Sequence, residues 1–459
     1  MLDWLTQLLW GWHVLLLLLG AGAYFTAATG FYQVRCLGRW LGAALASRRK
    51  GEGEEEGGKL SSFQALTAAL AGSLGTGNIV GVGVAIATGG AGALFWMWAS
   101  ALLGMMTVYA ENVLAARHRQ APGAPGDIRA AGRWGKPLAA VYAGGCCLSS
   151  LGMGTMAQTN SAAASLSTLG VPVAASALGL GLLAFWVARG GLALGAKITQ
   201  RLVPLMTLLF FGASLWVLWV FRENIPRAFA SVFQGAFSLK AGAGGAAGAL
   251  LALRTGVSRG VFTNEAGLGS SAFAYQEVEG RSPEELGCLG IFQVFVDTLV
   301  MCTVTGLCIL CCRSPVLEGG QLAFYAFESA LGPWGGRVAS LCTALFALAT
   351  LVAWCCWGRE GLFYLTGSRG RTPYALAAGA AAALGCLLPL GTVFQLGDAC
   401  NGLMALPNVA ALFLLRREAA GVCRRGGEGP SKGRRGKKSW GRFHKILKTA
   451  GIFSNLMVK

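Results

Sequence analysis

The sequence predicts an all-α membrane protein, one compact bundle of about eleven spans at roughly 20 residues per crossing. Three observations support this. Hydrophobic residues make up 54% of the 459 residues and charged residues only 13%, where a soluble domain carries about 25% charged residues. Apolar runs of spanning length recur along almost the whole chain, separated by short polar pieces. Two of those runs are interrupted by glycine-rich motifs.

The first apolar run, from Leu8 to Tyr32, is interpreted as a retained span because it is long for a signal peptide and no basic segment precedes it. The polar linker Gly51–Lys59 separates it from the rest. Ten further spans are predicted at Phe63–Gly89, Ala91–Ala115, Leu138–Leu169, Pro172–Ala188, Leu202–Phe221, Gly242–Tyr275, Leu286–Cys312, Val338–Leu365, Tyr374–Leu390 and Gly397–Leu415.

These spans divide the chain into six predicted segments. They are the extra first span with the start of the linker (1–50), the linker (51–60), a first five-helix repeat (61–221), a connecting loop (222–239), a second five-helix repeat (240–415) and a basic tail (416–459).

Charge predicts the orientation. The net charge is +18, and a large share of it follows Leu415. A basic tail is compatible with nucleic-acid binding, but next to a last span it favours the cytoplasmic side and anionic lipid. Basic residues in the loops predict the same side: Arg117, Arg119, Arg129, Arg133, Lys136, Arg189, Lys197, Arg201, Arg359, Arg369 and Arg371. We therefore expect the amino terminus outside a plasma membrane and the tail in the cytoplasm.

Metal and cofactor chemistry is not expected. Most of the 14 cysteines lie inside apolar runs, where they act as small packing residues. The histidines His13, His118 and His444 are scattered. Neither pattern predicts a transition-metal site, and no ATP-binding loop is present in the sequence.

The glycine-rich interruptions are the main functional signal. One run contains Gly75-Thr76-Gly77-Asn78, and another contains Asn264-Glu265-Ala266-Gly267-Leu268-Gly269. Glycine tolerates unwound backbone, and unwound backbone inside a membrane must face protein, water or a ligand. The alternative is that these glycines only allow close helix packing.

The positions of the interruptions add to this signal. Without the extra first span they fall in the first and sixth of ten spans, a pattern typical of inverted-repeat transporters. There, helix amino termini face a carboxylate and unwound carbonyls hold a cation.

At these residues the chain resembles the alanine or glycine:cation symporters of bacteria and archaea. The resemblance covers about Ser61 to Leu415. It depends on six motifs in order: GTGNIVGV at 75–82, GGAGALFWMW at 89–98, MAQTNS at 156–161, FTNEAGLGSS at 262–271, VFVDT at 294–298 and NGLMALPN at 401–408. It implies a LeuT-like five-plus-five inverted repeat with one extra leading helix, in the amino acid–polyamine–organocation superfamily.

The resemblance also implies the site. It places the substrate carboxylate on the amides of Gly75, Thr76 and Gly77, with Asn78 beside them. Further substrate contacts are expected from Gln158 and Trp354, and from Gly267 and Gly269 of the second interruption. For Gln158 and Trp354 a purely structural role, in interhelical bonding or packing, stays open.

For the coupling ion, the resemblance implies the carbonyls of Ala71 and Leu74 and the hydroxyl of Thr350. Relatives tend to carry a Ser-Thr pair here, whereas this chain has Ala349-Thr350, so one hydroxyl ligand is missing. Sodium is the expected ion, and protons or weakened coupling are the alternatives.

Intramembrane carboxylates are costly and are therefore expected to be functional. Glu265, Asp297 with Thr298, and Asp398 fall inside predicted spans, and we assign Glu265, Asp297 and Thr298 to a gating or ion network. Together the sequence predicts a monomeric sodium-coupled symporter for alanine, glycine or both. A proton-coupled carrier is the second interpretation, and a membrane-embedded enzyme is a more remote alternative because no nucleophile–base pair or metal cluster is visible.

Overall fold

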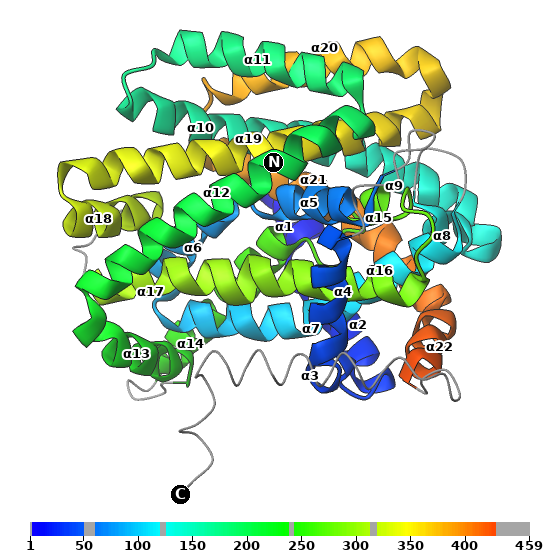
Figure 1. The fold of residues 1–459 in the computed structure, drawn as a ribbon, viewed down its shortest axis with the longest axis horizontal. Helices are drawn as coiled ribbons and strands as arrows, with labels where there is room; N and C mark the ends of the chain where they lie inside the picture. Colours follow the sequence, from blue (N-terminus) through cyan, green and yellow to red (C-terminus); the bar gives the residue numbers. More distant parts are fainter. Residues whose placement is uncertain (1, 50–59, 120–124, 238–242, 313–318, 428–459) are drawn as a thin grey trace, which may run out of the picture.

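The computed structural model describes residues 2–49, 60–119, 125–237, 243–312 and 319–427. In this part of the chain every regular element is a helix, apart from one isolated bridge between Leu60 and Val278. The long helices run side by side in a single bundle (Figure 1). The predicted linker Gly51–Lys59 and the tail beyond residue 427 lie outside the described residues.

The chain begins with four helices that precede the predicted repeats. They are α1 (Leu2–Trp10), α2 (Trp12–Ala28), α3 (Tyr32–Arg35) and α4 (Leu37–Arg49). The sequence predicts one span over Leu8–Tyr32, and a candidate span covers Thr6–Ala28, with a bend at Gly11 between α1 and α2. A side chain there would lie 2.2 Å from the carbonyl oxygen of Gln7, so the bend needs glycine.

The first predicted repeat consists of α-helices with a π-helical segment and short 3₁₀ turns between them. Its segments are α5 (Ser62–Ser73), η1 (Thr76–Asn78), α6 (Val80–Gly89), α7 (Gly92–Arg117), α8 (Gly126–Arg129), η2 (Gly132–Trp134), α9 (Gly135–Ser149), the π-helix η3 (Ser150–Met156), α10 (Ala157–Thr168), α11 (Val173–Gly190) and α12 (Leu192–Val220).

A turn and a helix connect the two predicted repeats: η4 (Arg222–Asn224) and α13 (Ile225–Phe237). The second repeat contains α14 (Ala243–Asn264), α15 (Ala272–Tyr275), α16 (Pro283–Val294), the π-helix η5 (Phe295–Cys302), α17 (Thr303–Cys312), α18 (Gly319–Leu331), α19 (Pro333–Thr366), η6 (Gly367–Gly370), α20 (Arg371–Gly385) and α21 (Leu390–Leu414). The described chain ends in α22 (Arg416–Gly427).

Two sequence predictions on connections are wrong. Lys197 and Arg201 do not lie in a loop, because α12 begins at Leu192 and includes both residues. Arg359 does not lie in a loop either, because α19 continues to Thr366. The segment predicted as a connecting loop forms α13, which buries the stripe Ala228, Val232 and Ala236 and exposes Phe229 and Phe233. An apolar stripe at helical spacing explains why this segment is helical.

Seven helices in the described residues are long and apolar enough to cross a membrane. An eighth is added if the bent pair Gly391–Leu414 and Arg416–Val422 forms one span. The interrupted segments α5–α6 and α14–α15 are not among these candidate spans, although Val80–Gly89 is an apolar helix. The architecture is therefore that of a multi-pass membrane protein.

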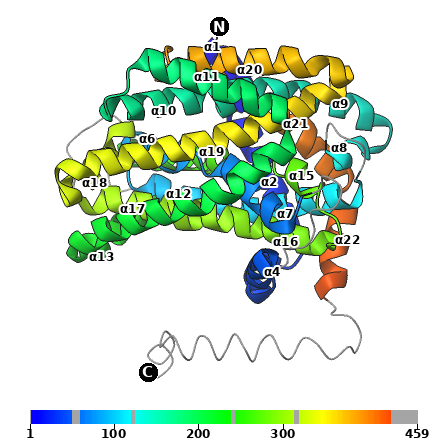
Figure 2. The same cartoon turned by 45° about the horizontal axis from the view of Figure 1, so that its top comes forward.

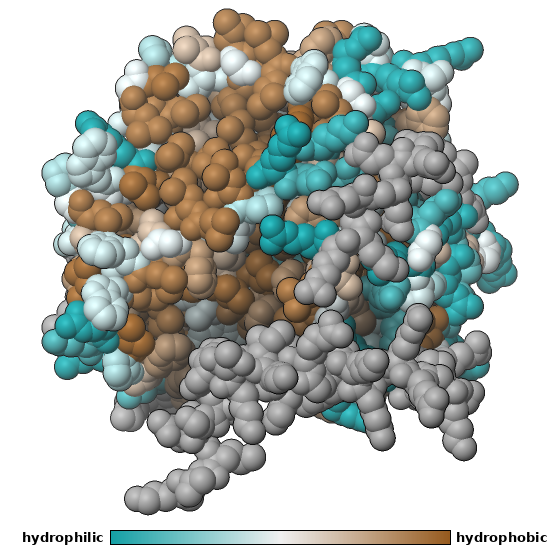
Figure 3. Space-filling model, viewed as in Figure 1, coloured by the Kyte–Doolittle hydropathy of each residue, from teal (hydrophilic) through white to brown (hydrophobic). Residues whose placement is uncertain are grey.

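The surface agrees with a lipid environment. Apolar side chains cover much of the face shown in Figure 3. On α12, Leu205, Leu208, Trp216 and Trp219 are 61%, 73%, 54% and 64% exposed. A soluble monomer rarely leaves so large a contiguous apolar area open to water.

Helix pairing places the interrupted segments inside the bundle. α14 packs along α7 and α6, α16 packs along α7, and α19 packs against α5, α9, α10 and α12. α11 and α20 pair with each other at one side of the bundle, as the turned view shows (Figure 2). The interrupted segment α5–α6 is almost entirely buried.

The isolated bridge joins the start of the first interrupted segment to the residues that follow the second. Leu60, just before α5, pairs in parallel with Val278, just after α15. The backbone amide of Leu60 donates to the carbonyl oxygen of Glu277 at 3.4 Å. α5 and α15 are also in direct contact.

Candidate functional site

The first interruption lies between α5 and α6. α5 starts with a capping box in which Ser61 and Gln64 satisfy each other's backbone amides, and it ends at Ser73. Leu74 leaves the helical conformation and Gly75 is extended, before η1 and α6 resume the path. A side chain on Gly75 would lie 2.7 Å from the hydroxyl oxygen of Thr350, so this position has no room for one.

The three predicted cation ligands meet at the end of α5. The Thr350 hydroxyl of α19 donates to the carbonyl oxygens of Ala71 at 2.8 Å and Leu74 at 3.3 Å. All three residues are buried. Oxygen atoms gathered in this way suit a hard cation such as sodium. Ala349, where the resemblance leads us to expect a hydroxyl, is also buried.

Gln158 reaches the first interruption from α10, directly after the π-helix η3. Its side-chain oxygen accepts hydrogen bonds from the amide of Thr76 at 3.2 Å and from the hydroxyl of Thr76 at 3.1 Å. The side-chain oxygen of Asn78 accepts from the amide of Gly75 at 3.0 Å. Two of the three amides predicted to bind a carboxylate therefore already face side-chain oxygens.

Asn78 also links this segment to the π-helix η5. Its side-chain nitrogen donates to the carboxylate of Asp297 at 2.8 Å and to the Asp297 carbonyl oxygen at 3.0 Å. The hydroxyl of Thr298 donates to the other carboxylate oxygen at 2.7 Å. A buried carboxylate thus has two donors and orients Asn78 toward Gly75.

The second interruption lies between α14 and α15 and uses left-handed backbone. Gly267 and Gly269 have φ values of +92° and +67°, which glycine adopts without strain. Glu265 has a φ of 58°, which is uncommon for a residue with a side chain. Such a conformation costs about 1–3 kcal/mol and occurs where surrounding structure fixes it.

Side chains from other helices hold the second interruption. Tyr142 of α9 donates to the carbonyl oxygen of Leu268 at 3.0 Å. Asn408 of α21 donates to the carbonyl oxygen of Gly267 at 2.9 Å. On α7, the carboxylate of Glu111 accepts from the amide of Gly269 at 3.2 Å and from Asn408 at 2.7 Å.

Glu111 and Asn408 are not among the site residues that the sequence predicts. Asn408 belongs to the NGLMALPN motif, and Glu111 is a buried acid inside the predicted span Ala91–Ala115. The rarity of intramembrane carboxylates is the signal that could identify Glu111 from the sequence.

The predicted substrate residues fall into two groups. Gly75, Thr76, Asn78 and Gln158 lie together with Thr350 and Asp297, as described above. Gly267 and Gly269 contact α2, α9 and α21 instead, through Leu18, Tyr142 and Asn408. The two interruptions approach each other at Gly77, where a side chain would lie 2.9 Å from the hydroxyl oxygen of Thr263 of α14.

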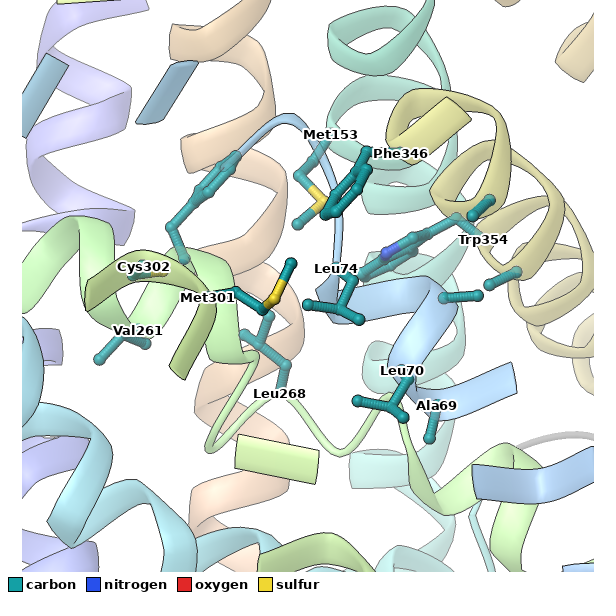
Figure 4. Close-up of a cluster of buried hydrophobic side chains, with 14 of the residues drawn as sticks. Ala69, Leu70, Leu74, Met153, Val261, Leu268, Met301, Cys302, Phe346 and Trp354 are labelled. Carbon is teal, nitrogen blue, oxygen red and sulfur yellow. The ribbon is translucent and has the colours of Figure 1, made fainter. Parts of the chain in front are cut away.

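Trp354 of α19 is fully buried beside the first interruption. Its indole nitrogen donates to the carboxylate of Glu265 at 2.9 Å, and its ring meets that of Trp357 edge-on, with centroids 5.2 Å apart. Figure 4 shows Trp354 and Phe346 with Met153, Met301 and Leu74 in one apolar cluster around the interruption. This cluster forms an apolar wall next to polar backbone.

Two polar residues from the sequence analysis have structural partners elsewhere. Asn160 donates to the carbonyl oxygens of Gly385 and Leu388 at the end of α20. Asp398 of α21 pairs with Arg259 of α14 at 3.1 Å, and the Arg259 guanidinium lies over the rings of Phe262 and Phe394. No group of three or more His, Cys, Asp or Glu side chains suited to a metal ion occurs in the described residues.

Comparisons with known proteins agree with one another. The family model described as "Sodium:alanine symporter family" matches residues 1–435. An uncharacterized transporter of Haemophilus influenzae is 36% identical, over 91% of this chain and 93% of its own. The sodium/alanine symporter AgcS of Methanococcus maripaludis is 35% identical, over 90% and 94%.

The probable sodium/glutamine symporter GlnT of Bacillus subtilis is 32% identical, over 90% of this chain and 87% of its own. The match covers almost the whole chain, the relatives are transporters rather than enzymes, and the structure is a multi-pass helical bundle. The chain therefore belongs to the sodium:alanine symporter family and is a cation-coupled amino-acid symporter.

Proposed function

We propose that this protein couples sodium entry to the uptake of alanine, glycine or both by alternating access. It acts as a monomer in the plasma membrane, with its amino terminus outside and its basic tail in the cytoplasm. One observation carries the proposal: the Ala71 and Leu74 carbonyls and the Thr350 hydroxyl converge directly beside the loosened amides of Gly75 and Thr76. An ion and a carboxylate bound there attract each other.

The proposed fold is the LeuT-like five-plus-five inverted repeat with one extra leading helix. The interruptions support it, because they fall in the segments α5–α6 and α14–α15, which are the first and sixth after the leading helices. In this arrangement half-helix ends and unwound backbone form the binding site near the middle of the membrane.

The substrate carboxylate replaces side-chain oxygens that now occupy the amides. The oxygen of Gln158 accepts from Thr76, and that of Asn78 accepts from Gly75. An amino-acid carboxylate offers the same kind of acceptor with a full negative charge and forms stronger hydrogen bonds to those amides. Gln158 and Asn78 then reorient toward the substrate.

Sodium binds between the hydroxyl oxygen of Thr350 and the carbonyl oxygens of Ala71 and Leu74. The Thr350 hydroxyl donates to these carbonyls, and a cation draws all three oxygens toward itself as acceptors. Three protein oxygens are few for a hard cation, so the substrate carboxylate or water completes the shell. This arrangement makes ion and substrate binding mutually favourable, which is the basis of coupling.

Asp297 supports the site from the opposite side. Its carboxylate fixes Asn78, and Asn78 in turn contacts the amide of Gly75. We assign Asp297 and Thr298 to the network that positions the first interruption during transport. We assign Glu265 to the same role, because it holds Trp354 of α19 beside the first interruption.

A proton-coupled carrier is the second candidate. It is favoured by Ala349, which removes one of two hydroxyls expected at the cation site. Titratable groups are close at hand, because the carboxylates of Asp297 and Glu265 are both buried near the interruptions.

Uptake by purified protein in proteoliposomes tests both candidates. Labelled alanine and glycine are offered with an inward sodium gradient, with a proton gradient, or with neither. We expect accumulation only with the sodium gradient. Accumulation driven by a proton gradient alone would show that protons, and not sodium, are the coupling ion. No accumulation of any amino acid would refute the proposed function.

A further inference from the structure

We propose that Glu265 is a specificity-determining positioning residue: its carboxylate fixes the indole of Trp354 as the wall that limits substrate side-chain size. This inference rests on the proposed function. It assigns Glu265 a role in substrate selection, in addition to its place in the second interruption.

The contact between the two side chains is well defined. Trp354 is fully buried, so its indole N–H needs an acceptor inside the protein. The acceptor is the Glu265 carboxylate at 2.9 Å. The other carboxylate oxygen of Glu265 accepts a hydrogen bond from the hydroxyl of Ser270. Both oxygens of the buried acid are therefore engaged, and the carboxylate has a fixed orientation.

The backbone conformation at Glu265 is unusual for a residue with a side chain. Its φ of 58° places a residue with a side chain in the left-handed region, where glycine is the usual choice. Three residues later the amide of Leu268 returns a hydrogen bond to the Glu265 carbonyl oxygen at 3.0 Å. A strained position that keeps its glutamate indicates that the side chain is needed there.

The other sides of Trp354 are closed by close packing. A side chain on Gly154 of the π-helix η3 would lie 2.3 Å from the Trp354 Cβ. Trp357, the ring partner of Trp354, presses on Gly72 of α5, where a side chain would lie 1.9 Å from the ring. The indole is therefore held between η3 and Trp357, and Glu265 holds its polar edge.

This chain of contacts joins the two interruptions. It runs from Gly72 of α5 through Trp357 and Trp354 to Glu265 and Ser270. In the proposed site, an indole fixed in this way limits the space for a substrate side chain. Without the Glu265 acceptor the indole keeps its packing against η3 and Trp357 but loses the contact that fixes its polar edge. This edge can then shift and admit a larger side chain. The substrate class selected is thus amino acids with no side chain or a methyl group.

Three variants separate this role from a general structural one. Glu265→Gln keeps an oxygen that accepts from the indole but removes the charge. Glu265→Ala removes the acceptor, and both variants keep an unbranched residue at the left-handed position. Trp354→Phe keeps an aromatic ring but removes the indole N–H, so Glu265 can no longer fix the ring by a hydrogen bond.

The experiment measures how well unlabelled leucine competes with labelled alanine in proteoliposomes. For Glu265→Ala we expect leucine to compete at about tenfold lower concentration than for the wild type, the size of effect typical for side-chain discrimination in a pocket. Glu265→Gln keeps the wild-type competition ratio. In a Trp354→Phe background, adding Glu265→Ala leaves the ratio unchanged, because the contact is already absent.

Each outcome decides the matter. An unchanged leucine ratio in Glu265→Ala, with alanine uptake retained, overturns the inference. Equal effects of Glu265→Ala in the wild-type and Trp354→Phe backgrounds overturn it too, since Glu265 then acts without Trp354. If Glu265→Ala is not monodisperse in detergent, Glu265→Met, which keeps the length of the side chain but has no oxygen acceptor for the indole, is measured in its place and is judged by the same two criteria. Absence of alanine uptake by the wild type contradicts the proposed function instead.

Discussion

Single residues at the first interruption set the shape of the proposed cation site. Gly75 and Thr350 approach so closely that a methyl group on Gly75 would lie 2.7 Å from the Thr350 hydroxyl oxygen. Gly81 of α6 has open space around it, because a methyl group on Gly81 would meet no other segment of the chain within 4 Å. The two glycines therefore form a matched pair for substitution.

Gly75→Ala is expected to push the Thr350 hydroxyl away from the carbonyls of Ala71 and Leu74. The sodium concentration that gives half-maximal alanine uptake should rise about tenfold, equivalent to about 1.4 kcal/mol of binding energy. Gly81→Ala serves as the control and should keep the wild-type sodium dependence. Equal behaviour of the two variants would argue against a cation site at Thr350.

Ala349→Ser is expected to act in the opposite direction. It supplies the second hydroxyl that the resemblance leads us to expect before Thr350, and an added oxygen ligand strengthens binding of a hard cation. The half-maximal sodium concentration for alanine uptake should fall several-fold, or about 1 kcal/mol. Ala347→Ser, two residues earlier on the same buried helix, tests whether any added hydroxyl has this effect.

The loosened backbone residues are easier to predict from the sequence than their partners. Gly75 and Asn78 stand in a motif of glycine and polar residues that has no role in a simple anchor. The contact of Trp354 with Glu265 joins positions 89 residues apart, and no local pattern encodes it. Glu111 is a lone acid in a long apolar run, and its partners Gly269 and Asn408 lie far along the chain.

At the scale of elements, close backbone approach ties the helices together. Gly335 and Gly336 are neighbours at the start of α19. A side chain on Gly335 would lie 2.1 Å from the Phe327 carbonyl oxygen of α18, whereas Gly336 faces open space. Backbone cannot move aside as a side chain does, so only Gly335 is sterically required.

Gly335→Ala is expected to lower thermal stability in detergent by about 1–3 kcal/mol, the usual cost of overpacking. Gly336→Ala should be neutral or raise stability by up to about 1 kcal/mol, because alanine favours the helix. Thermal unfolding followed by tryptophan fluorescence measures both. A similar loss in the two variants would mean that α18 and α19 do not pack as described.

The ion pair of Arg259 with Asp398 ties α14 to α21. Asp398→Asn leaves a partly buried guanidinium without its counter-charge, which typically costs about 3–5 kcal/mol. The double variant Arg259→Met with Asp398→Leu removes both charges and should recover most of that loss. The measurement compares the thermal stability in detergent of the wild type, Asp398→Asn and the double variant. A double variant as unstable as Asp398→Asn would contradict the ion pair.

Elements are predictable where composition alone defines them. The uninterrupted apolar runs predict α7, α11 and α19 within several residues at most ends. The π-helices η3 and η5 are not predicted, because a shift from α to π hydrogen bonding has no sequence signature of its own. α12 starts ten residues before its predicted span at Leu202, since Lys197 and Arg201 suggest a loop although both fit a helix.

At the scale of the whole molecule, the proposed orientation follows from the basic loops. A reporter fused after Gly427 is expected on the cytoplasmic side. Green fluorescent protein should fluoresce there, and alkaline phosphatase, which needs an oxidising compartment, should be inactive. The same fusions placed in the loop between α9–α10 and α11, after Gly170, should give the reverse result. A fluorescent fusion at Gly170 together with active phosphatase at Gly427 would invert the topology.

The overall class is readable from composition, because a chain with few charges and many long apolar runs has no soluble alternative. The number of continuous spans is harder to predict, since interrupted helices cross the bundle in pieces. Substrate choice lies beyond composition altogether: relatives of similar identity bear the names of alanine and glutamine symporters.

The bridge between Leu60 and Val278 has a consequence for how the protein tolerates mutation. It is made by main-chain atoms, so the hydrogen bond itself does not depend on the two side chains, whereas the burial of Leu60 and Val278 in the core does. Proline at position 60 is the exception, because it lacks the amide hydrogen. That one replacement would remove the hydrogen bond that joins the residue before α5 to the segment after α15, and the link between the two interrupted segments would then depend on the packing of α5 against α15.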